Sequence, residues 1–186
     1  MAYTESTMLP LGTEAPEFVL PDMLNGGLVS LRDYASDTAT VIMFLCNHCP
    51  YVLYINAELV KIVSTYQEKG VSFIGINSND AENYPEDAPE KMGPHARDVG
   101  YHFPYLYDET QEVARAYDAA CTPDFYVFDG NLKLVYRGQL DASRPKRNPV
   151  ECTGADLRAA LDAVIAGSSL NPVQIPSGGC NIKWKN

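Results

Sequence analysis

Two cysteines, Cys46 and Cys49, stand where an apolar run gives way to a proline, and this junction constrains the fold more than any other stretch. The run from Val41 to Leu45 is short and uninterrupted, which is typical of a strand that is buried on both faces. Pro50 lacks a backbone N–H and fits a helix only in its first turn, so a helix is predicted to begin close to Cys49. The helix is predicted to end at Gly70. Its apolar stripe consists of Val52, Ile55, Leu59, Ile62, Val63 and Tyr66.

The start of a helix gives this junction its chemistry. Unpaired N–H groups and the helix dipole stabilise negative charge there, and the thiolate is the nucleophile in disulfide exchange. We expect Cys46 to have the lowered pKa, because it lies nearest the free N–H groups and keeps access to solvent. An imidazolium on His48 would favour the thiolate further. Cys46, His48 and Cys49 are therefore the candidate catalytic residues, with the two cysteines as a reversible redox pair.

Composition and charge narrow the classes of protein. The 186 residues are 46% hydrophobic, which suits one compact domain, expected at residues 11–167. We expect a loose leader at 1–10 and a C-terminal tail at 168–186 that packs on the domain. A net charge of −10 argues against nucleic acid or an anionic membrane as partner, and no apolar run approaches the roughly 20 residues of a membrane span. The first residues lack the features of a secretory signal, and five cysteines are an odd number for a disulfide framework, so a cytoplasmic location is expected.

The order of the remaining elements predicts an α/β fold. Residues 18–20 and 28–31 flank Asn25-Gly26-Gly27 and predict a β-hairpin near the N-terminus. A second buried strand is predicted at 71–76, so strand, helix and strand form a parallel unit with a right-handed crossover. The acidic stretch 77–89 is expected to be a solvated loop. Further predicted elements are a helix at 109–117 capped by Asp108, a hairpin of strands at 124–128 and 132–137, and a helix at 156–165 capped by Thr153.

Four stretches together carry a family resemblance: Gly12 with Ala15-Pro16-Glu17-Phe18, Cys46-Asn47-His48-Cys49-Pro50, Cys121-Thr122-Pro123-Asp124-Phe125 and Gly179-Cys180-Asn181-Ile182-Lys183-Trp184. In this order they resemble the thioredoxin-like superfamily, and more narrowly the redoxins related to peroxiredoxins (AhpC/TSA type) and bacterial thiol-disulfide oxidoreductases. The resemblance covers roughly residues 11–166. It implies a thioredoxin-like fold with a central mixed β-sheet flanked by helices. It also implies that the Thr122–Pro123 bond is cis and faces the cysteine turn, so that Thr122 and Pro123 bind the substrate chain.

Two features depart from the patterns of these families. Thioredoxins carry a buried acid in the strand before the cysteines, but here the nearest equivalent is about Thr40 and the strand contains no acid. Peroxiredoxins have a Pro-x-x-x-Thr-x-x-Cys pattern. If Cys49 takes the peroxidatic place, Cys46 stands where the threonine belongs and Ile42 where the proline belongs. The proton relay and the identity of the attacking cysteine therefore stay open.

The other reactive residue types have simpler alternatives. Cys121 lies just before Pro123 and Cys180 lies in the tail, so both are candidates for additional redox groups, with a buried structural cysteine as the alternative. Arg137 is a candidate for the arginine of peroxiredoxins, with a strand-end salt bridge as the alternative. No second pair of cysteines at short spacing accompanies the first, so neither a metal nor another cofactor is expected.

The leading hypothesis is a thiol-disulfide oxidoreductase in which Cys46 attacks a disulfide and Cys49 resolves the mixed disulfide. The alternative enzyme is an antioxidant, peroxiredoxin-like thiol peroxidase, in which Cys49 is oxidised to sulfenic acid and Cys46 or Cys180 condenses with it. A non-enzymatic alternative is a thioredoxin-fold binding or metal-binding module. The expected substrates are protein or small-molecule disulfides, or peroxides, and a thiol is expected to donate the electrons. The protein is expected to be a monomer or a homodimer.

Overall fold

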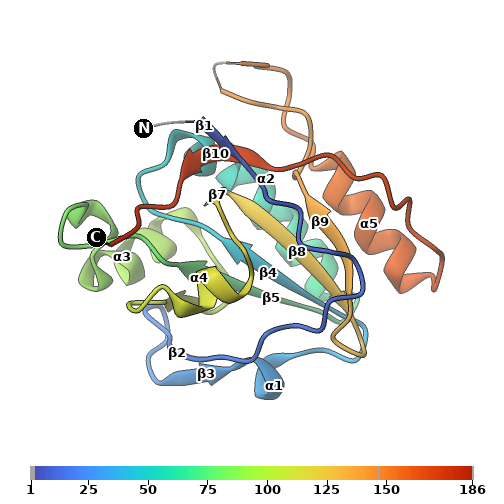
Figure 1. The fold of residues 1–186 in the computed structure, drawn as a ribbon, viewed down its shortest axis with the longest axis horizontal. Coiled ribbons are helices and arrows are strands. Elements are labelled where there is room, and N and C mark those ends of the chain that lie inside the picture. The colour runs from blue at the N-terminus through green and yellow to red at the C-terminus, as the bar shows by residue number, and fades with distance from the viewer. Residues whose placement is uncertain (1–2, 146, 186) are drawn as a thin grey trace.

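The computed structural model describes residues 3–145 and 147–185, and its centre is a five-stranded sheet of order β6-β5-β4-β8-β9 (Figure 1). β4, β5 and β6 are parallel, whereas β8 runs antiparallel to β4, and β9 antiparallel to β8. The predicted α/β class, with a mixed central sheet flanked by helices, is confirmed. The strands span Ala39–Phe44 (β4), Val71–Asn77 (β5), Tyr105–Tyr107 (β6), Asp124–Asp129 (β8) and Leu134–Gly138 (β9).

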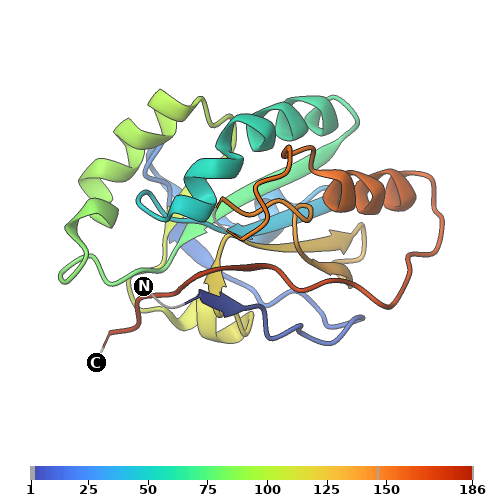
Figure 2. The ribbon, with the colours of Figure 1, turned by 90° about the horizontal axis from the view of Figure 1, so that it is seen from above.

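Helices cover both faces of this sheet (Figure 2). The long helix α2 (Pro50–Gln67) lies on one face together with α3 (Pro89–Val99) and α5 (Ala155–Ile165). On the other face lie α1 (Leu31–Tyr34), α4 (Glu112–Ala116) and the N-terminal segment. A short 3₁₀ turn, η1 (Pro85–Asp87), comes directly before α3.

The apolar run before the cysteines fills the middle of the molecule. All residues of β4 are buried, and they alternate between two cores. Val41 and Met43 pack with Leu59 of α2, whereas Ile42 and Phe44 belong to the core on the opposite face. Burying one such side chain contributes about 1.5–3 kcal/mol, and a slip of one residue would exchange the two faces. The strand therefore fixes where the chain leaves the sheet and enters the cysteine turn.

The predicted N-terminal hairpin is confirmed, as β2 (Val19–Pro21) paired antiparallel with β3 (Leu28–Ser30). Gly26 and Gly27, with φ values of +81° and +80°, supply the left-handed backbone that this turn requires. The Ser30 hydroxyl then accepts the N–H of Asp33 and begins α1.

The predicted N-cap residues of two helices are wrong, because in each case a carboxylate outside the helix accepts N–H groups at its start. α4 begins at Glu112 rather than 109, and the Asp108 carboxylate accepts the N–H groups of Val113 and Ala114 from outside the helix. The residue before α5 is Gly154, in a left-handed conformation, and not Thr153. There the Asp141 carboxylate accepts the N–H groups of both Thr153 and Gly154. At α4 the predicted cap residue accepts these N–H groups from outside the helix, and at α5 a residue distant in the sequence does so.

A second sheet joins segments from both ends of the described chain. It has the order β1-β10-β7 and is antiparallel throughout, with strands Tyr3–Glu5 (β1), Gly178–Asn181 (β10) and Cys121–Thr122 (β7). The sequence predicts a loose leader over 1–10, yet residues 3–5 are held by backbone pairing with the tail. Residues 1, 2 and 186 lie outside the described residues. Figure 2 shows the tail crossing the molecule beside the N-terminal strand.

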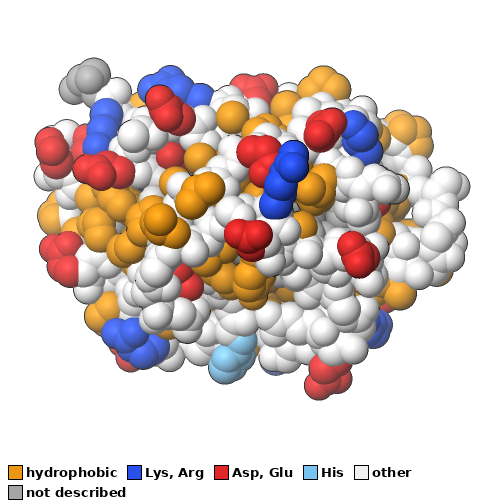
Figure 3. All heavy atoms as spheres, turned by 90° about the horizontal axis from the view of Figure 1, so that it is seen from below, with side chains coloured by type: hydrophobic (Ala, Val, Ile, Leu, Met, Phe, Trp, Pro, Cys, Tyr) orange, Lys and Arg blue, Asp and Glu red, His pale blue; other side chains and the backbone are white. Residues whose placement is uncertain are grey.

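The surface matches the composition. On the face drawn in Figure 3, acidic and basic side chains are interspersed among hydrophobic ones, without a continuous basic band. Within the described part of the chain, each helix is either too short or too polar to pass through a bilayer.

Candidate active site

The two cysteines lie at the junction of β4 and α2. Cys49 is the N-cap residue of α2, with Pro50 as the first helical residue, and Cys46 follows the end of β4. The two sulfurs are not joined in a disulfide. Cys46 exposes 1% of its surface and Cys49 exposes 0%. The expectation that Cys46 keeps access to solvent is therefore wrong.

Thr122 lies against both sulfurs. Its hydroxyl oxygen is 3.4 Å from Cys46 Sγ, and its carbonyl oxygen accepts a hydrogen bond of 3.3 Å from Cys49 Sγ. The bond between Thr122 and Pro123 is cis, as the resemblance implies. The structure thus brings together four residues that the sequence singles out.

The pKa values of the two thiols are shifted in opposite directions. Burial raises the pKa of Cys46 well above its ordinary value, and the contact with Cys49 and the nearby Asp87 carboxylate raise it further. The pKa of Cys49 is lowered instead, first by a hydrogen bond from the Cys180 thiol, then by one from Cys46, and also by the backbone N–H of Val52 in the first turn of α2. The favoured thiolate is Cys49, which reverses the expectation from the sequence.

His48 pairs with a buried acid. Its Nδ1 lies 2.8 Å from Oδ2 of Asp87, but the N–H direction is off the line to that oxygen, so the contact is an ion pair rather than an aligned hydrogen bond. The carboxylate raises the pKa of His48. The imidazole also stacks on Tyr84, with the ring centroids 5.9 Å apart. Because Asp87 balances its positive charge, His48 stabilises a neighbouring thiolate less than the sequence suggests.

Asp87 is the site residue that sequence reasoning misses. The sequence predicts a solvated loop at 77–89, yet the Asp87 carboxylate is fully buried. It accepts hydrogen bonds of 2.7 Å from the Asn47 backbone and 2.7 Å from the Asn79 side chain. Burial raises the pKa of Asp87, but the contacts with His48, Asn79 and Asn47 outweigh burial and lower it overall. The sequence signal that could have found Asp87 is its position in the loop after the carboxyl end of β5, at the same sheet edge as Cys46.

The acid missing from β4 has no replacement within that strand. Thr40 lies near the far end of β4, where its hydroxyl accepts the N–H of Ser36. Asp124, at the start of β8, is fully buried, and burial raises its pKa to about 7. Its carboxylate accepts a hydrogen bond of 3.0 Å from the hydroxyl of Tyr126. Both side chains point to the opposite face from Phe125, which packs in the core that contains the thiols.

The remaining cysteines lie in different surroundings. Cys180 stands opposite Thr122 in the pairing of β10 with β7, and its thiol contacts Cys49. The Cys121 thiol is fully buried, 3.7 Å from the carbonyl oxygen of Pro123, and burial raises its pKa. Cys152 is half-buried, and burial raises its pKa to about 11. Of the two candidate additional redox groups, the structure brings Cys180 into contact with the pair and directs the Cys121 sulfur toward a backbone carbonyl.

A possible set of metal ligands occurs at this site. Ligand atoms of Cys46, His48 and Asp87 lie within 4.8 Å of one another. Both oxygens of Asp87 are already engaged, Oδ1 by the Asn47 N–H and Oδ2 by Asn79 and His48. A metal ion would have to displace these contacts, so we interpret the cluster as an ion pair beside a thiol.

Arg137 points away from the cysteines. Its guanidinium donates hydrogen bonds to the carbonyl oxygen of Leu9 and to the side chain of Gln174. It therefore connects β9 to the tail and to the N-terminal segment, and it is occupied there rather than at the sulfurs.

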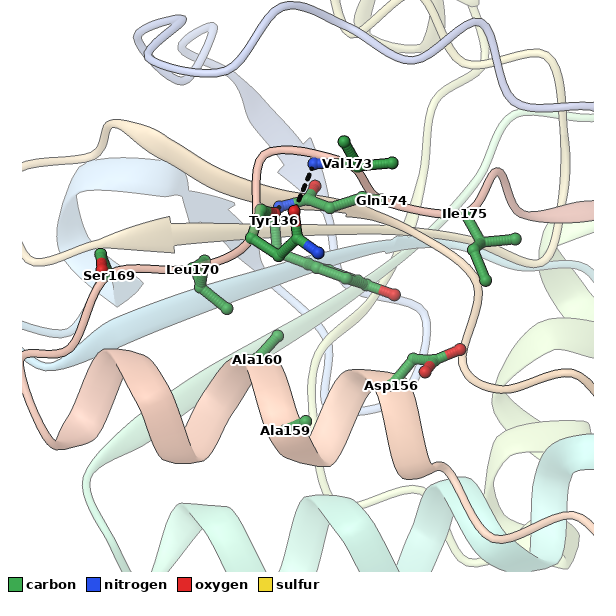
Figure 4. A pocket seen from close by; sticks show the side chains of 10 residues that line it. Tyr136, Asp156, Ala159, Ala160, Ser169, Leu170, Val173, Gln174 and Ile175 are labelled. Atoms are coloured by element: carbon green, nitrogen blue, oxygen red, sulfur yellow. Dashed lines mark hydrogen bonds between the residues drawn. The ribbon is translucent and has the colours of Figure 1, made fainter.

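A sizeable pocket lies away from the thiols. It has a volume of about 390 Å³ and lies between α5 and residues 169–175, with Tyr136 and Asp156 in its lining, and no cysteine lines it (Figure 4). The hollow beside Pro123, bounded in part by Tyr51 and Gly178, holds only about 10 Å³, close to the smallest volume that accommodates one water molecule. With the tail in place, this hollow has no room for a substrate.

Residues 11–137, more than half of the chain, match the sequence pattern of the AhpC/TSA family. The chain belongs to the AhpC/TSA family. This AhpC/TSA protein is an oxidoreductase, and the resemblance drawn from the sequence is confirmed.

Relatives of this AhpC/TSA protein carry names from both predicted enzyme classes. It is 28% identical to the thiol-disulfide oxidoreductase ResA of Geobacillus thermodenitrificans over 134 residues, which are 71% of each chain. It is 29% identical over 116 residues to a Mycobacterium tuberculosis protein named as a peroxiredoxin, covering 62% of this chain and 68% of that relative.

Solved structures resemble the fold. An uncharacterised conserved protein from Geobacillus kaustophilus is 60% identical, with a TM-score of 0.97 over 100% of this chain and 97% of that chain. The thioredoxin domain of a thiol-disulfide oxidoreductase from Bacteroides vulgatus has a TM-score of 0.59 at 20% identity, over 69% of this chain and 88% of that chain. The predicted thioredoxin-like fold is confirmed.

Proposed function

We propose that this AhpC/TSA protein is a thiol-disulfide oxidoreductase with Cys46 and Cys49 as its redox pair and Cys49 as the attacking sulfur. One observation carries the proposal. Cys49 occupies the N-cap position of α2 and accepts hydrogen bonds from neighbouring thiols, while burial keeps the proton on Cys46. A thiolate next to a protonated partner suits disulfide exchange, because one sulfur attacks and the other then resolves the mixed disulfide.

The reaction proceeds in two exchanges. The Cys49 thiolate attacks one sulfur of the substrate disulfide, a Cys49–substrate bond forms, and the other substrate sulfur leaves as a thiolate. Cys46 then gives up its proton to that thiolate and attacks the Cys49 sulfur. The Cys46–Cys49 disulfide forms and the second substrate sulfur leaves, so the substrate gains two electrons that the protein loses. An external thiol donor returns the pair to the reduced form.

The Asp87–His48 pair supports the difference between the two sulfurs. The negative charge of Asp87 raises the pKa of Cys46 and favours the proton there. The hydrogen bond from the Asn47 N–H to Asp87 holds the turn between the cysteines in place. Neither Asp87 nor His48 needs to touch the substrate in this scheme, so both are positioning residues.

Thr122 and Pro123 remain the proposed substrate-binding residues, because Thr122 contacts both sulfurs. We expect the substrate to be a protein or small-molecule disulfide and the location to be the cytoplasm, where thiol donors keep such a pair reduced.

Reduction of insulin disulfides, with dithiothreitol as the thiol donor, tests this function. The wild-type protein should accelerate the reaction, and Cys46→Ser and Cys49→Ser should each return it to the uncatalysed rate. Cys152→Ser is the matched control and should behave as wild type. Full activity of Cys49→Ser would contradict the assignment of the attacking sulfur.

A second candidate, a thiol peroxidase, is favoured by the same lowered pKa of Cys49 and by the relative named as a peroxiredoxin. In it the Cys49 thiolate attacks a peroxide oxygen and becomes a sulfenic acid, and Cys46 condenses with it, releasing water. The reductase is our first choice because Arg137, the candidate peroxide-binding arginine, bonds elsewhere. Thiol-dependent loss of hydrogen peroxide, without insulin reduction, would select the peroxidase instead.

A further inference from the structure

The C-terminal strand occupies a position beside the cysteines where an extended substrate would bind. β10 pairs antiparallel with β7, so that Cys180 stands opposite Thr122 and Asn181 stands opposite Cys121. A peptide can bind at a strand edge by adding one more strand through backbone hydrogen bonds. At β7 the protein's own chain already makes that pairing.

Two glycines allow this close approach. A Cβ atom added to Gly179 would overlap the carbonyl oxygen of Thr122, the same oxygen that accepts the hydrogen bond from Cys49. A Cβ atom added to Gly178 would overlap the hydroxyl of Tyr3 in β1. The pair of glycines thus lets β10 pass between β1 and β7 and brings the next residue, Cys180, to the site.

Polar contacts on both sides of Cys180 hold the strand in place. Before it, the Ser177 hydroxyl donates a hydrogen bond of 2.9 Å to the carbonyl oxygen of Pro123. After it, the Lys183 N–H donates one of 2.8 Å to the side chain of Asn79. Cys180 itself is only 3% exposed, so its thiol faces the interior rather than solvent.

Cys49 contacts two thiols at once. Cys46 and Cys180 both hydrogen-bond to it, and all three residues belong to one buried cluster. In its thiol form, Cys49 donates a hydrogen bond to the carbonyl oxygen of Thr122, the residue directly across the ladder from Cys180. From such contact, a disulfide of about 2 Å needs only side-chain rotation and a small approach.

We propose that Cys180 is a third redox-active cysteine and that β10 is an internal substrate, with the Cys49 sulfur exchanging between a disulfide to Cys46 and a disulfide to Cys180. This rests on the proposed function. The Cys180 thiolate attacks the Cys49 sulfur of the Cys46–Cys49 disulfide, the Cys49–Cys180 bond forms and the Cys46–Cys49 bond breaks. Cys46 takes up the proton that Cys180 lost, and no electrons enter or leave, because one disulfide replaces another.

The exchange determines whether the site is open. When Cys49 is bonded to Cys180, β10 is tied covalently across Thr122 and outside disulfides are excluded. When Cys180 is reduced, only hydrogen bonds and packing hold the strand, and it can move aside for a substrate.

Oxidation of the Cys46→Ser variant with diamide, followed by trypsin and mass spectrometry, tests the proposal. Trypsin places Cys49 on residues 33–61 and Cys180 on residues 159–183, apart from Cys121 and Cys152. We expect these two peptides to be joined as the main oxidised product. The link should be lost when Cys180→Ser is added and kept when Cys152→Ser is added.

Absence of the linked peptides, in a Cys46→Ser protein whose circular dichroism matches wild type, would overturn the proposal. Oxidation of the wild-type protein is a second test. Limited oxidation should yield residues 33–61 joined to 159–183 beside the Cys46–Cys49 disulfide, whereas the latter alone would overturn the proposal. Failure of the proposed function has a different signature, namely a wild-type protein that does not reduce insulin whether or not the peptides are joined.

Discussion

The Nδ1 of His48 lies 2.8 Å from Oδ2 of Asp87, so a partly buried imidazole is paired with a fully buried carboxylate next to Cys46. Each partner shifts the other's pKa toward its charged form. The pair places a buried acid beside the cysteines, although that acid comes from the turn before α3 rather than from β4. The negative charge of Asp87 raises the pKa of Cys46, so the thiolate is favoured on Cys49 rather than on Cys46.

Replacing His48 by Gln should destabilise the protein in a pH-dependent way. The loss at pH 6 should be about 2 kcal/mol, because the buried Asp87 carboxylate loses the partner that balances its charge. Because the pKa of His48 is raised in the folded state, its contribution is complete below the ordinary value of about 6.5 and is lost as the pH rises through the raised value. Urea unfolding at pH 6 and pH 8 measures this, with the exposed His102→Gln as control. Equal destabilisation of His48→Gln at both pH values would contradict it.

Replacing Asp87 by Asn should act on both the fold and the thiols. Loss of the charged acceptor for Asn47, Asn79 and His48 should cost about 2–3 kcal/mol. The pKa of Cys46 should fall, because a negative charge that raises it is removed. The Cβ chemical shift of Cys46 followed against pH by NMR reports this directly. An unchanged titration would refute the role of Asp87, and the neighbouring Glu86→Gln should leave the titration as in wild type.

Asp124 should make the protein lose stability as the pH rises from about 4 to about 7. Burial raises its pKa to about 7, so the folded state favours the neutral acid. That contribution is present below the ordinary value of about 3.9 and is lost as the pH rises through the raised value. Asp124→Asn stays neutral, so its stability relative to wild type should rise by roughly 2–3 kcal/mol from pH 5 to pH 8. Urea unfolding of this variant and of the exposed Asp37→Asn, which is not among the groups that shift the pKa of Asp124, provides the comparison. A pH-independent difference would show that Asp124 ionises normally.

A larger residue at position 179 should open the site. Gly179→Ala places a methyl group against the Thr122 carbonyl oxygen and should loosen β10 from β7. Iodoacetamide should then modify Cys49 and Cys180 faster in the reduced protein, as followed by peptide mass spectrometry. Gly167→Ala is the control, because its left-handed φ of +66° also makes an alanine strained, whereas its added Cβ meets nothing within 4 Å. Identical rates in the two variants would mean that the tail does not cover the thiols.

The central elements could be predicted because local patterns determine them. The run from Val41 to Leu45 is buried by layers on both faces. A parallel strand of that kind is a continuous apolar run without polar alternation, so it can be recognised in the sequence. Pro50 fixed the start of α2 because its missing N–H leaves few other places in a helix.

The rest depends on contacts between distant segments. β1 and β10 are short, and Gly178-Gly179 has neither an alternation of apolar and polar residues nor β-propensity. No sequence pattern therefore indicates that these strands pair. Asp87 is buried by Asn47 and Asn79, whose approach follows from the sheet and not from sequence spacing. The choice of thiolate could not be predicted for the same reason, because it depends on hydrogen-bond donors to Cys49 that include the side chain at position 180 in the tail.

Trapping of a mixed disulfide tests the central claim most directly. In a Cys180→Ser background, which removes the third thiol but leaves a hydroxyl that can still donate a hydrogen bond to Cys49, Cys46→Ser and Cys49→Ser are each treated with an aromatic disulfide such as 5,5′-dithiobis(2-nitrobenzoate) at pH 6 and examined by mass spectrometry. The account predicts a stable adduct on Cys49 in the first protein and none on Cys46 in the second. An adduct on Cys46 with an unmodified Cys49 would contradict it and make Cys46 the attacking sulfur.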